Sequence, residues 1–173
     1  MKLYQQVDIP NLAELQAAIL NIIPTNRKTE TDLFYLPIGY YMVLPEFREM
    51  LEILNLTDHV GTVATTVVAP GVSLPIHEDS GDMPWSLNIP CQGCEGTYIA
   101  WYKPNIKSTY VDRAEKDTGY YCYPLEACEE IERLDMAGPA IVNIHTPHGV
   151  INPTDQTRIL TAIRLRNMDN QAQ

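Results

Sequence analysis

The sequence lacks the features that would place it in a membrane, on a nucleic acid or outside the cell. No apolar run approaches the roughly 20 residues that a membrane-spanning helix needs. Basic residues are scarce: 12 Lys and Arg stand against 22 Asp and Glu, and a net charge of −10 opposes binding to a phosphate backbone. Residues 1–10 contain one Lys and no apolar signal-peptide core. We therefore expect a cytoplasmic protein with no nucleic-acid or membrane partner.

Cysteine is too sparse and too unevenly spaced to predict a zinc site. The first pair, Cys91 and Cys94, has the spacing of a zinc ligand pair, but five residues separate Cys122 from Cys128. In a chain without an export signal, the thiols are expected to stay reduced. We interpret all four as loop and strand cysteines. The alternative, a zinc-stabilised interaction module, would be excluded by zinc retention after all four are changed to Ser.

The composition is that of one globular domain, 1–173, because 45% of the residues are hydrophobic and 20% are charged. Residues 1–58 predict a helical support. An apolar stripe at helical spacing runs from Leu12 to Ile23, after Asn11 at a capping position. A second helix is predicted from Pro45, since proline favours the first turn.

From residue 59 the hydrophobic period changes from 3.6 to 2, and turn residues separate short β-branched runs. The predicted strands are Val60–Ala69, Trp85–Ile89, Thr97–Tyr102, Ala140–Ile144, Gly149–Asn152 and Thr157–Leu165. Many short strands with this punctuation predict an antiparallel sandwich or barrel over 59–168. Residues 103–138 are less regular and are predicted to form an insertion or lid, with a short acidic helix around Glu126–Leu134.

Two short segments concentrate metal-ligating residue types. His77 and Asp79 are two positions apart, so in a strand their side chains point to the same side and can share one ion. The second segment contains His145 and His148. One of these histidines would complete a set of two histidines and one carboxylate. Such a set leaves open positions on Fe(II) for a co-substrate and O₂.

Arg158 follows His148 by ten residues. The order His-x-Asp, distal His and then Arg resembles the Fe(II)/2-oxoglutarate-dependent oxygenases. Residues 85–90 and 97–102 also resemble the strands after the first ligand in small members of that superfamily, which include aspartyl/asparaginyl hydroxylase-like proteins and bacterial and phage relatives. The resemblance covers about residues 60–165. It favours His148 as the distal ligand over His145, which lies thirteen residues before Arg158.

The resemblance implies a mainly β fold, the double-stranded β-helix or jelly roll, with the N-terminal helices packed on one sheet. It also implies that His77, Asp79 and His148 bind Fe(II), and that Arg158 clamps the distal carboxylate of 2-oxoglutarate. A guanidinium suits that role, because its planar fork can donate two charge-assisted hydrogen bonds to one carboxylate.

Three further residues are candidates for holding the co-substrate. Ser86 and Asn88 alternate with apolar residues in one predicted strand, so both point to the same face. We favour Asn88 over Ser86 and take Tyr98 as a third candidate. Arg164 shares the predicted face of Arg158 and could serve a substrate anion, although we interpret its side chain as solvated.

One departure separates the chain from the aspartyl/asparaginyl hydroxylase branch. As the resemblance would have it, that branch binds iron with two histidines and no carboxylate, whereas this chain supplies Asp79. A second co-substrate arginine near Ser86 is also missing. The sequence therefore fits the general superfamily pattern better than that branch, whose substrate should not be assumed here.

The expected function is that of an Fe(II)- and 2-oxoglutarate-dependent dioxygenase using O₂. We expect it to hydroxylate a small molecule or an amino-acid or peptide side chain. The alternative is a cupin-like metal-binding module or isomerase that does not use 2-oxoglutarate. Replacing Arg158 by Ala would distinguish the two, because only the oxygenase needs a carboxylate clamp at that position.

Overall fold

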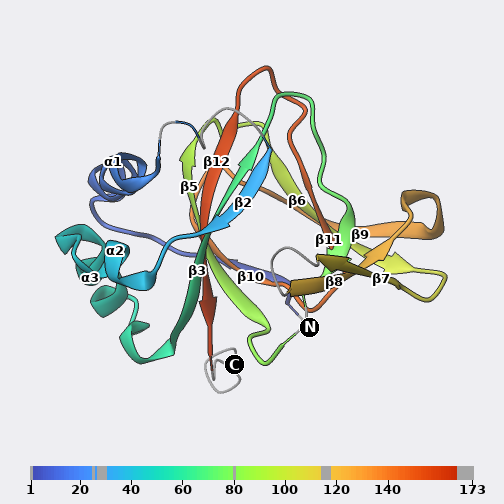
Figure 1. Ribbon diagram of the computed structural model, residues 1–173, viewed down its shortest axis with the longest axis horizontal. Helices are drawn as coiled ribbons and strands as arrows, with labels where there is room; N and C mark the ends of the chain where they lie inside the picture. Colours follow the sequence, from blue (N-terminus) through green and yellow to red (C-terminus); the bar gives the residue numbers. More distant parts are fainter. Residues whose placement is uncertain (1, 25, 27–30, 80, 114–117, 167–173) are drawn as a thin grey trace.

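Two six-stranded antiparallel sheets face each other, and helices cover the outer face of one of them (Figure 1). The computed structural model describes residues 2–24, 26, 31–79, 81–113 and 118–166. Sheet A has the order β1-β10-β5-β12-β3-β2, and sheet B has the order β7-β8-β4-β11-β6-β9. Successive strands therefore alternate between the sheets over much of the chain, as in a jelly roll. The predicted fold class is confirmed.

The helices are α1 (Leu12–Ile22), α2 (Ile38–Met42) and α3 (Pro45–Ile53), with short 3-10 turns at η2 (Thr57–His59) and η3 (Leu125–Ala127). The strands of sheet A are β1 (Tyr4–Gln6), β2 (Asp32–Tyr35), β3 (Val60–Val68), β5 (Trp85–Gln92), β10 (Ala140–Asn143) and β12 (Arg158–Leu165). The strands of sheet B are β4 (Ile76–Glu78), β6 (Tyr98–Pro104), β7 (Thr109–Arg113), β8 (Thr118–Tyr123), β9 (Cys128–Asp135) and β11 (His148–Ile151).

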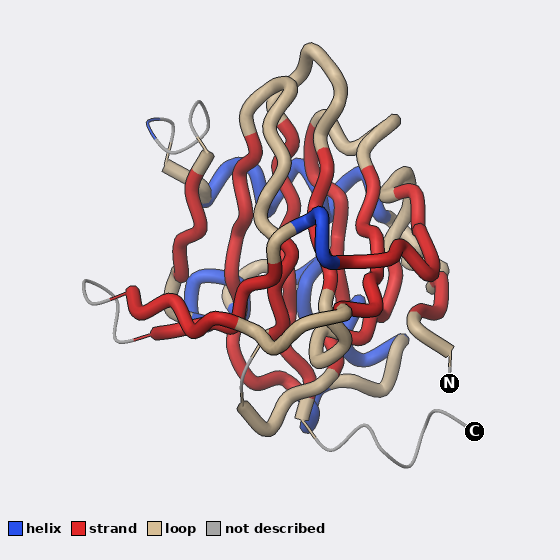
Figure 2. Tube along the Cα trace, turned by 90° about the vertical axis from the view of Figure 1, so that its right-hand side faces the viewer, coloured by secondary structure: helices blue, strands red, loops and turns tan. Residues whose placement is uncertain are grey.

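The core has two main layers, one on each face of sheet A. The layer between sheet A and the helices includes Leu15, Phe47 and Ile163, all of them buried. The layer between the two sheets includes Trp101 and Leu160. Figure 2 looks from the side of sheet B and shows the helices behind the strands. The helices therefore stabilise sheet A from outside, and the site lies on the other side of that sheet.

The two long helices form where the sequence predicts them, and the structure clarifies the segment between them. Asn11 precedes α1 as expected, but its backbone is left-handed, with φ 58°, and its side chain makes no capping hydrogen bond. The aromatic segment before Pro45 forms β2 and α2.

The predicted acidic helix around Glu126–Leu134 is wrong. Apart from the turn η3, this segment forms the edge strand β9, which pairs with β6 from Pro104 opposite Cys128 to Tyr98 opposite Asp135. Hydrogen bonds from β6 therefore outweigh the helical spacing of the glutamates. The segment 103–138 also supplies β7 and β8, so it extends sheet B (Figure 1).

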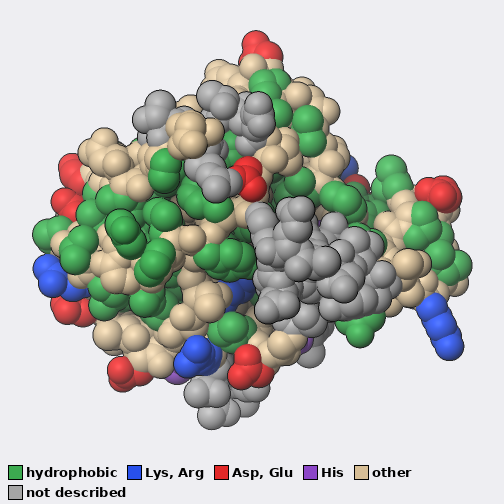
Figure 3. Space-filling view, viewed as in Figure 1, with side chains coloured by type: hydrophobic (Ala, Val, Ile, Leu, Met, Phe, Trp, Pro, Cys, Tyr) green, Lys and Arg blue, Asp and Glu red, His purple; other side chains and the backbone are tan. Residues whose placement is uncertain are grey.

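The outer surface of the helical layer is unusually apolar in places. Hydrophobic side chains gather on this side of the molecule in Figure 3. The large exposed hydrophobic residues of this layer and of β2 are Tyr35, Ile38, Tyr40, Val43 and Ile53. Among the residues that the structure describes, no helix is long and apolar enough to cross a membrane.

Candidate metal centre

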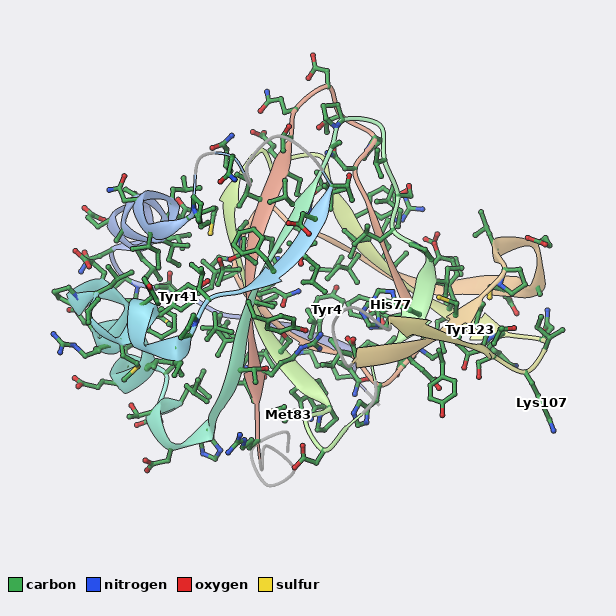
Figure 4. All side chains as sticks on the ribbon, in the orientation of Figure 1. Tyr4, Tyr41, His77, Met83, Lys107 and Tyr123 are labelled. Carbon is green, nitrogen blue, oxygen red and sulfur yellow. The ribbon has the colours of Figure 1, made fainter. Side chains whose placement is uncertain are left out.

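The structure brings the three predicted metal ligands together. His77, Asp79 and His148 each offer one ligand atom, and these atoms lie within 4.8 Å of one another. His77 lies in β4, Asp79 directly follows β4, and His148 begins β11. Figure 4 shows His77 on the side of sheet B, across the molecule from Tyr41 among the helices.

Strand pairing positions the two histidines. His148 and His77 are direct cross-strand partners in β11 and β4, and their ring centroids lie 4.5 Å apart. On its other side, His148 is the partner of Trp101 in β6. His148 is therefore held by neighbours on both sides, at the middle of sheet B.

The turn before β11 is fixed by hydrogen bonds to both sheets. The Asn143 side chain accepts a hydrogen bond from the Thr146 backbone N–H at 2.8 Å. The Asp79 N–H donates to the Ile144 carbonyl at 3.0 Å, and the Tyr102 N–H donates to the Pro147 carbonyl at 2.8 Å. The backbone of Asp79 and the turn that leads to His148 are thus tied together.

Both histidines carry their proton on the same ring nitrogen. Nδ1 of His77 lies 2.8 Å from the Pro75 carbonyl, and Nδ1 of His148 lies 3.0 Å from the Thr146 carbonyl. A carbonyl oxygen can only accept, so each Nδ1 donates, and Nε2 is the ring nitrogen that a metal would bind. Such contacts fix the tautomer and orientation of metal-binding histidines in proteins.

Electrostatics favours the protonation states that a metal requires. Burial lowers the pKa of His148 to about 3, with a smaller contribution from His77, so this ring is neutral near pH 7. Burial alone would raise the pKa of Asp79, but Arg164 and then the two histidines lower it below its usual value. His148 therefore presents a neutral imidazole and Asp79 a carboxylate.

Arg164 contacts this cluster, which corrects its interpretation as a solvated residue. Its Nη2 lies 2.9 Å from Oδ2 of Asp79, and its side chain is 19% exposed. Sequence spacing could not reveal this pair, because β12 belongs to sheet A and Asp79 follows a strand of sheet B. The only signal was alternation, which places Arg164 on the face of Arg158.

Arg158 is buried between the sheets, away from any carboxylate partner in the described part of the chain. It is 1% exposed, and its Nε donates to Oγ1 of Thr97 at 3.2 Å. Its Nη1 is also buried and has no hydrogen-bond partner among the described residues. Burial lowers the pKa of Arg158, and the nearby groups that oppose this effect are the thiols of Cys94 and Cys91.

Arg158 lies deeper in the barrel than the metal ligands. Thr97, which accepts the hydrogen bond from its Nε, directly precedes β6 and lies four residues before Trp101. Trp101 is the cross-strand partner of His148. The direction from the triad to Arg158 therefore follows the space between the sheets.

The three other co-substrate candidates lie in different places. Ser86 and Asn88 pair across β5 and β12 with Arg164 and Ala162, and the Ser86 hydroxyl donates to Oδ1 of Asn88 at 2.8 Å. Both therefore share the inward face of sheet A with Arg164. Tyr98 is not brought to this cluster, since its ring lies under the guanidinium of the exposed Arg133, 3.9 Å from the centroid.

The competing metal sites receive no support from the described residues. His145 is exposed, unlike the buried His148. Cys91 and Cys94 are buried at the end of β5, whereas Cys122 and Cys128 lie in sheet B. Within the described part of the chain, the triad is the one His/Cys/Asp/Glu group arranged to hold a metal.

Comparison with known proteins shows similarity in structure alone. No protein-family model matches the sequence, and no curated protein matches it significantly. The crystal structure of EvdO2 from Micromonospora carbonacea var. aurantiaca, complexed with 2-oxoglutarate, matches with a TM-score of 0.52 at 16% identity. This match covers 92% of this chain and 84% of that chain.

Two hydroxylases match over nearly their whole length but with lower TM-scores. A prolyl-4-hydroxylase from Pseudomonas putida has a TM-score of 0.46 at 15% identity and covers 95% of this chain and 92% of its own. The viral collagen prolyl hydroxylase of Paramecium Bursaria Chlorella virus-1, in its 2OG complex, has a TM-score of 0.46 at 12% identity, with coverages of 95% and 96%. At these identities the comparisons establish the fold, and the EvdO2 match carries that conclusion.

The fold and the donor set together define the class of site. The chain is a jelly roll of the double-stranded β-helix type, and it carries a His-x-Asp…His cluster between its sheets. Two imidazoles and one carboxylate are the donors of the facial triad in mononuclear non-haem iron proteins.

Proposed function

We propose that this protein is an Fe(II)- and 2-oxoglutarate-dependent dioxygenase. His77, Asp79 and His148 would hold Fe(II), and Arg158 would bind the distal carboxylate of 2-oxoglutarate. The proposal rests on one observation above all: a buried arginine that has no anionic partner among the described residues lies between the same two sheets as the triad.

The donor cluster fits Fe(II) in its ligand types, in the orientation of its histidine rings and in its protonation states. Each Nδ1 donates to a backbone carbonyl two residues earlier, so Nε2 is the ring nitrogen that would bind the metal. The lowered pKa of His148 keeps its ring neutral, and the lowered pKa of Asp79 keeps its carboxylate charged. Three protein ligands leave room on an octahedral ion for a chelating co-substrate and O₂.

Arg158 distinguishes this proposal from a cupin-like module that binds metal without 2-oxoglutarate. Burying a guanidinium without a counter-ion lowers the free energy of unfolding by an amount on the order of several kcal/mol, the penalty for desolvating one ion. A dicarboxylate held at one end by the metal could extend toward Nη1 of Arg158 and neutralise it. A module that does not use 2-oxoglutarate would have no need to bear that cost.

When bound, iron and 2-oxoglutarate would supply O₂-dependent oxidation of a C–H bond, with succinate and CO₂ formed from the co-substrate. The residues described here would bind and orient both partners and keep the reaction away from bulk water. A small molecule or an amino-acid or peptide side chain remains the proposed substrate. The acidic composition argues against a nucleic acid.

The test needs no substrate. Fe(II) and then 2-oxoglutarate are added without oxygen, and the visible charge-transfer band of the chelated 2-oxo acid is titrated. We expect a band for the wild type, none for His148→Ala and a weakened co-substrate affinity, by about 100-fold or more, for Arg158→Met. His145→Ala is the matched control and should behave as the wild type, because His145 is exposed.

The outcomes separate the competing functions. Iron binding without a band would contradict the oxygenase and support the cupin-like module. A band that persists unchanged in Arg158→Met would place the distal carboxylate elsewhere. Absence of iron binding would show that the triad is not a metal site.

A further inference from the structure

Arg164 has hydrogen-bonding capacity that the protein does not use. Its Nη2 pairs with Asp79, but its Nη1 is buried and has no hydrogen-bond partner among the described residues. A buried donor without a partner usually indicates a bound water or a ligand that completes it. This nitrogen belongs to the guanidinium that contacts Asp79, a proposed metal ligand. A molecule bound to Nη1 would therefore lie beside the metal.

The neighbouring polar groups do not satisfy Nη1. Ser86 is the cross-strand partner of Arg164, and its hydroxyl donates to Asn88, but its oxygen accepts no hydrogen bond from Nη1. The next inward residue of β12 is Ala162, which leaves space and offers no polar side-chain atom. Among the described residues, Nη1 of Arg164 therefore has no acceptor within hydrogen-bond distance.

Arg164 and the metal would share one carboxylate, that of Asp79, once the site is loaded. The triad contains one carboxylate, that of Asp79. The side chains that lower the pKa of this carboxylate are Arg164, His148 and His77. A divalent cation is balanced by that carboxylate together with the chelating carboxylate of a 2-oxo acid. The permanent positive charge of Arg164 then has only the Asp79 carboxylate beside it, which it would share with the metal.

We infer that Arg164 forms an anion subsite beside the metal and that the substrate carries a carboxylate group which this guanidinium binds. The inference rests on the proposed function and adds the substrate class to it. Nη2 would remain on Asp79, while Nη1 would donate to the substrate carboxylate. Holding the anion there would place the adjoining carbon atoms of the substrate next to the oxidising centre.

The experiment uses acetate as the probe and acetamide as its neutral counterpart of nearly equal shape. Mn(II) replaces Fe(II), 2-oxoglutarate is saturating, and the relaxation rate of the probe's methyl protons reports its distance from the paramagnetic ion. We expect a severalfold larger enhancement for acetate than for acetamide with the wild type. Arg164→Met should remove the difference, and Arg164→Lys should retain part of it, because it keeps the charge.

Arg166→Met is the matched control. It removes an equal charge two residues further along, at an exposed position, and should leave the acetate effect unchanged. Equal enhancement by acetate and acetamide in the wild type would overturn the inference. So would an acetate effect that survives in Arg164→Met, since acetate would then be bound to the metal itself.

Two further measurements separate this inference from the proposed function. Water-proton relaxation shows whether Mn(II) is bound, and the anaerobic Fe(II) band shows whether 2-oxoglutarate binds. Loss of the band in Arg164→Met would mean that Nη1 serves the co-substrate, and it would overturn the inference while leaving the oxygenase intact. If the wild type shows no band, the acetate titration without 2-oxoglutarate still tests Arg164 by itself.

Discussion

The two faces of β12 show how one strand separates stability from chemistry. The face toward the helices carries Ile159, Ile163 and Leu165, all fully buried. Its one polar residue, Thr161, lies 3.2 Å from the hydroxyl of Thr65, which is in turn 3.1 Å from that of Tyr41. Every polar side chain on this face is thus paired within the protein.

The face toward sheet B is different, because its two arginines each leave one buried nitrogen without a partner in the described structure. Nη1 of Arg158 lies deep in the barrel, and Nη1 of Arg164 lies beside the triad. Unpaired buried donors reduce stability, so a face that retains them is suited to binding ligands. The comparison predicts opposite effects for substitutions on the two faces.

The largest effect is expected on the helix side. Ile163→Ala would remove a fully buried side chain and leave a cavity against the helices, which should lower the free energy of unfolding by about 2–5 kcal/mol. Chemical denaturation measures this loss. Fe(II) affinity of the folded variant should stay within about twofold of the wild type, because Ile163 packs in the layer against the helices. A tenfold loss would correspond to about 1.4 kcal/mol. A collapse of iron affinity would show that the two faces are not independent.

Acid should destabilise the metal-free protein because His148 is buried in its neutral form. The pKa of His148 is about 3 in the folded state, whereas an unfolded histidine titrates near 6.5. Between these values the unfolded state binds a proton that the folded state does not, so stability falls as the pH falls. The expected loss from pH 6.5 to 5 is about 2 kcal/mol.

Urea unfolding in the presence of a chelator at several pH values checks this prediction. The window above pH 5 avoids most carboxylate titration. The control is His148→Gln, which has no titrating ring and should show a smaller slope. An equal slope in both proteins would assign the acid sensitivity to other groups.

Arg158→Met should raise stability and lower the affinity for 2-oxoglutarate, which tests the comparison of the two faces. The substitution removes a buried charge that has no anionic partner and keeps an unbranched side chain of similar reach. We expect the free energy of unfolding without ligand to rise by about 1–2 kcal/mol, while 2-oxoglutarate affinity falls. Thermal unfolding with and without 2-oxoglutarate measures both changes. A loss of stability instead would mean that the bond to Thr97 outweighs the cost of burial.

Sequence reasoning succeeded where local spacing carries the information. The period-2 runs predicted the central strands, and the two-residue step from His77 to Asp79 predicted one shared side of a strand. It failed for β9, where Glu129, Glu130 and Glu132 are exposed on an edge strand and leave no alternation to detect. It also missed the pair of Arg164 with Asp79, because that contact forms between two sheets and has no signature in sequence distance.

Arg133 provides the smallest effect and the sharpest reference for Arg158. It is an exposed arginine whose Nε and Nη2 lie 2.9 and 3.0 Å from the Glu130 carboxylate, and its guanidinium stacks on Tyr98. Arg133→Met should therefore lower stability slightly, because solvent screens the ion pair. Arg158→Met applies the same chemical change to an unpaired, buried arginine and should raise stability. Thermal unfolding of the two variants side by side gives the sign of each change. Opposite signs would show that pairing and burial determine how each arginine affects the free energy of unfolding. Equal signs would remove the basis for treating the inner face of β12 as a ligand-binding surface.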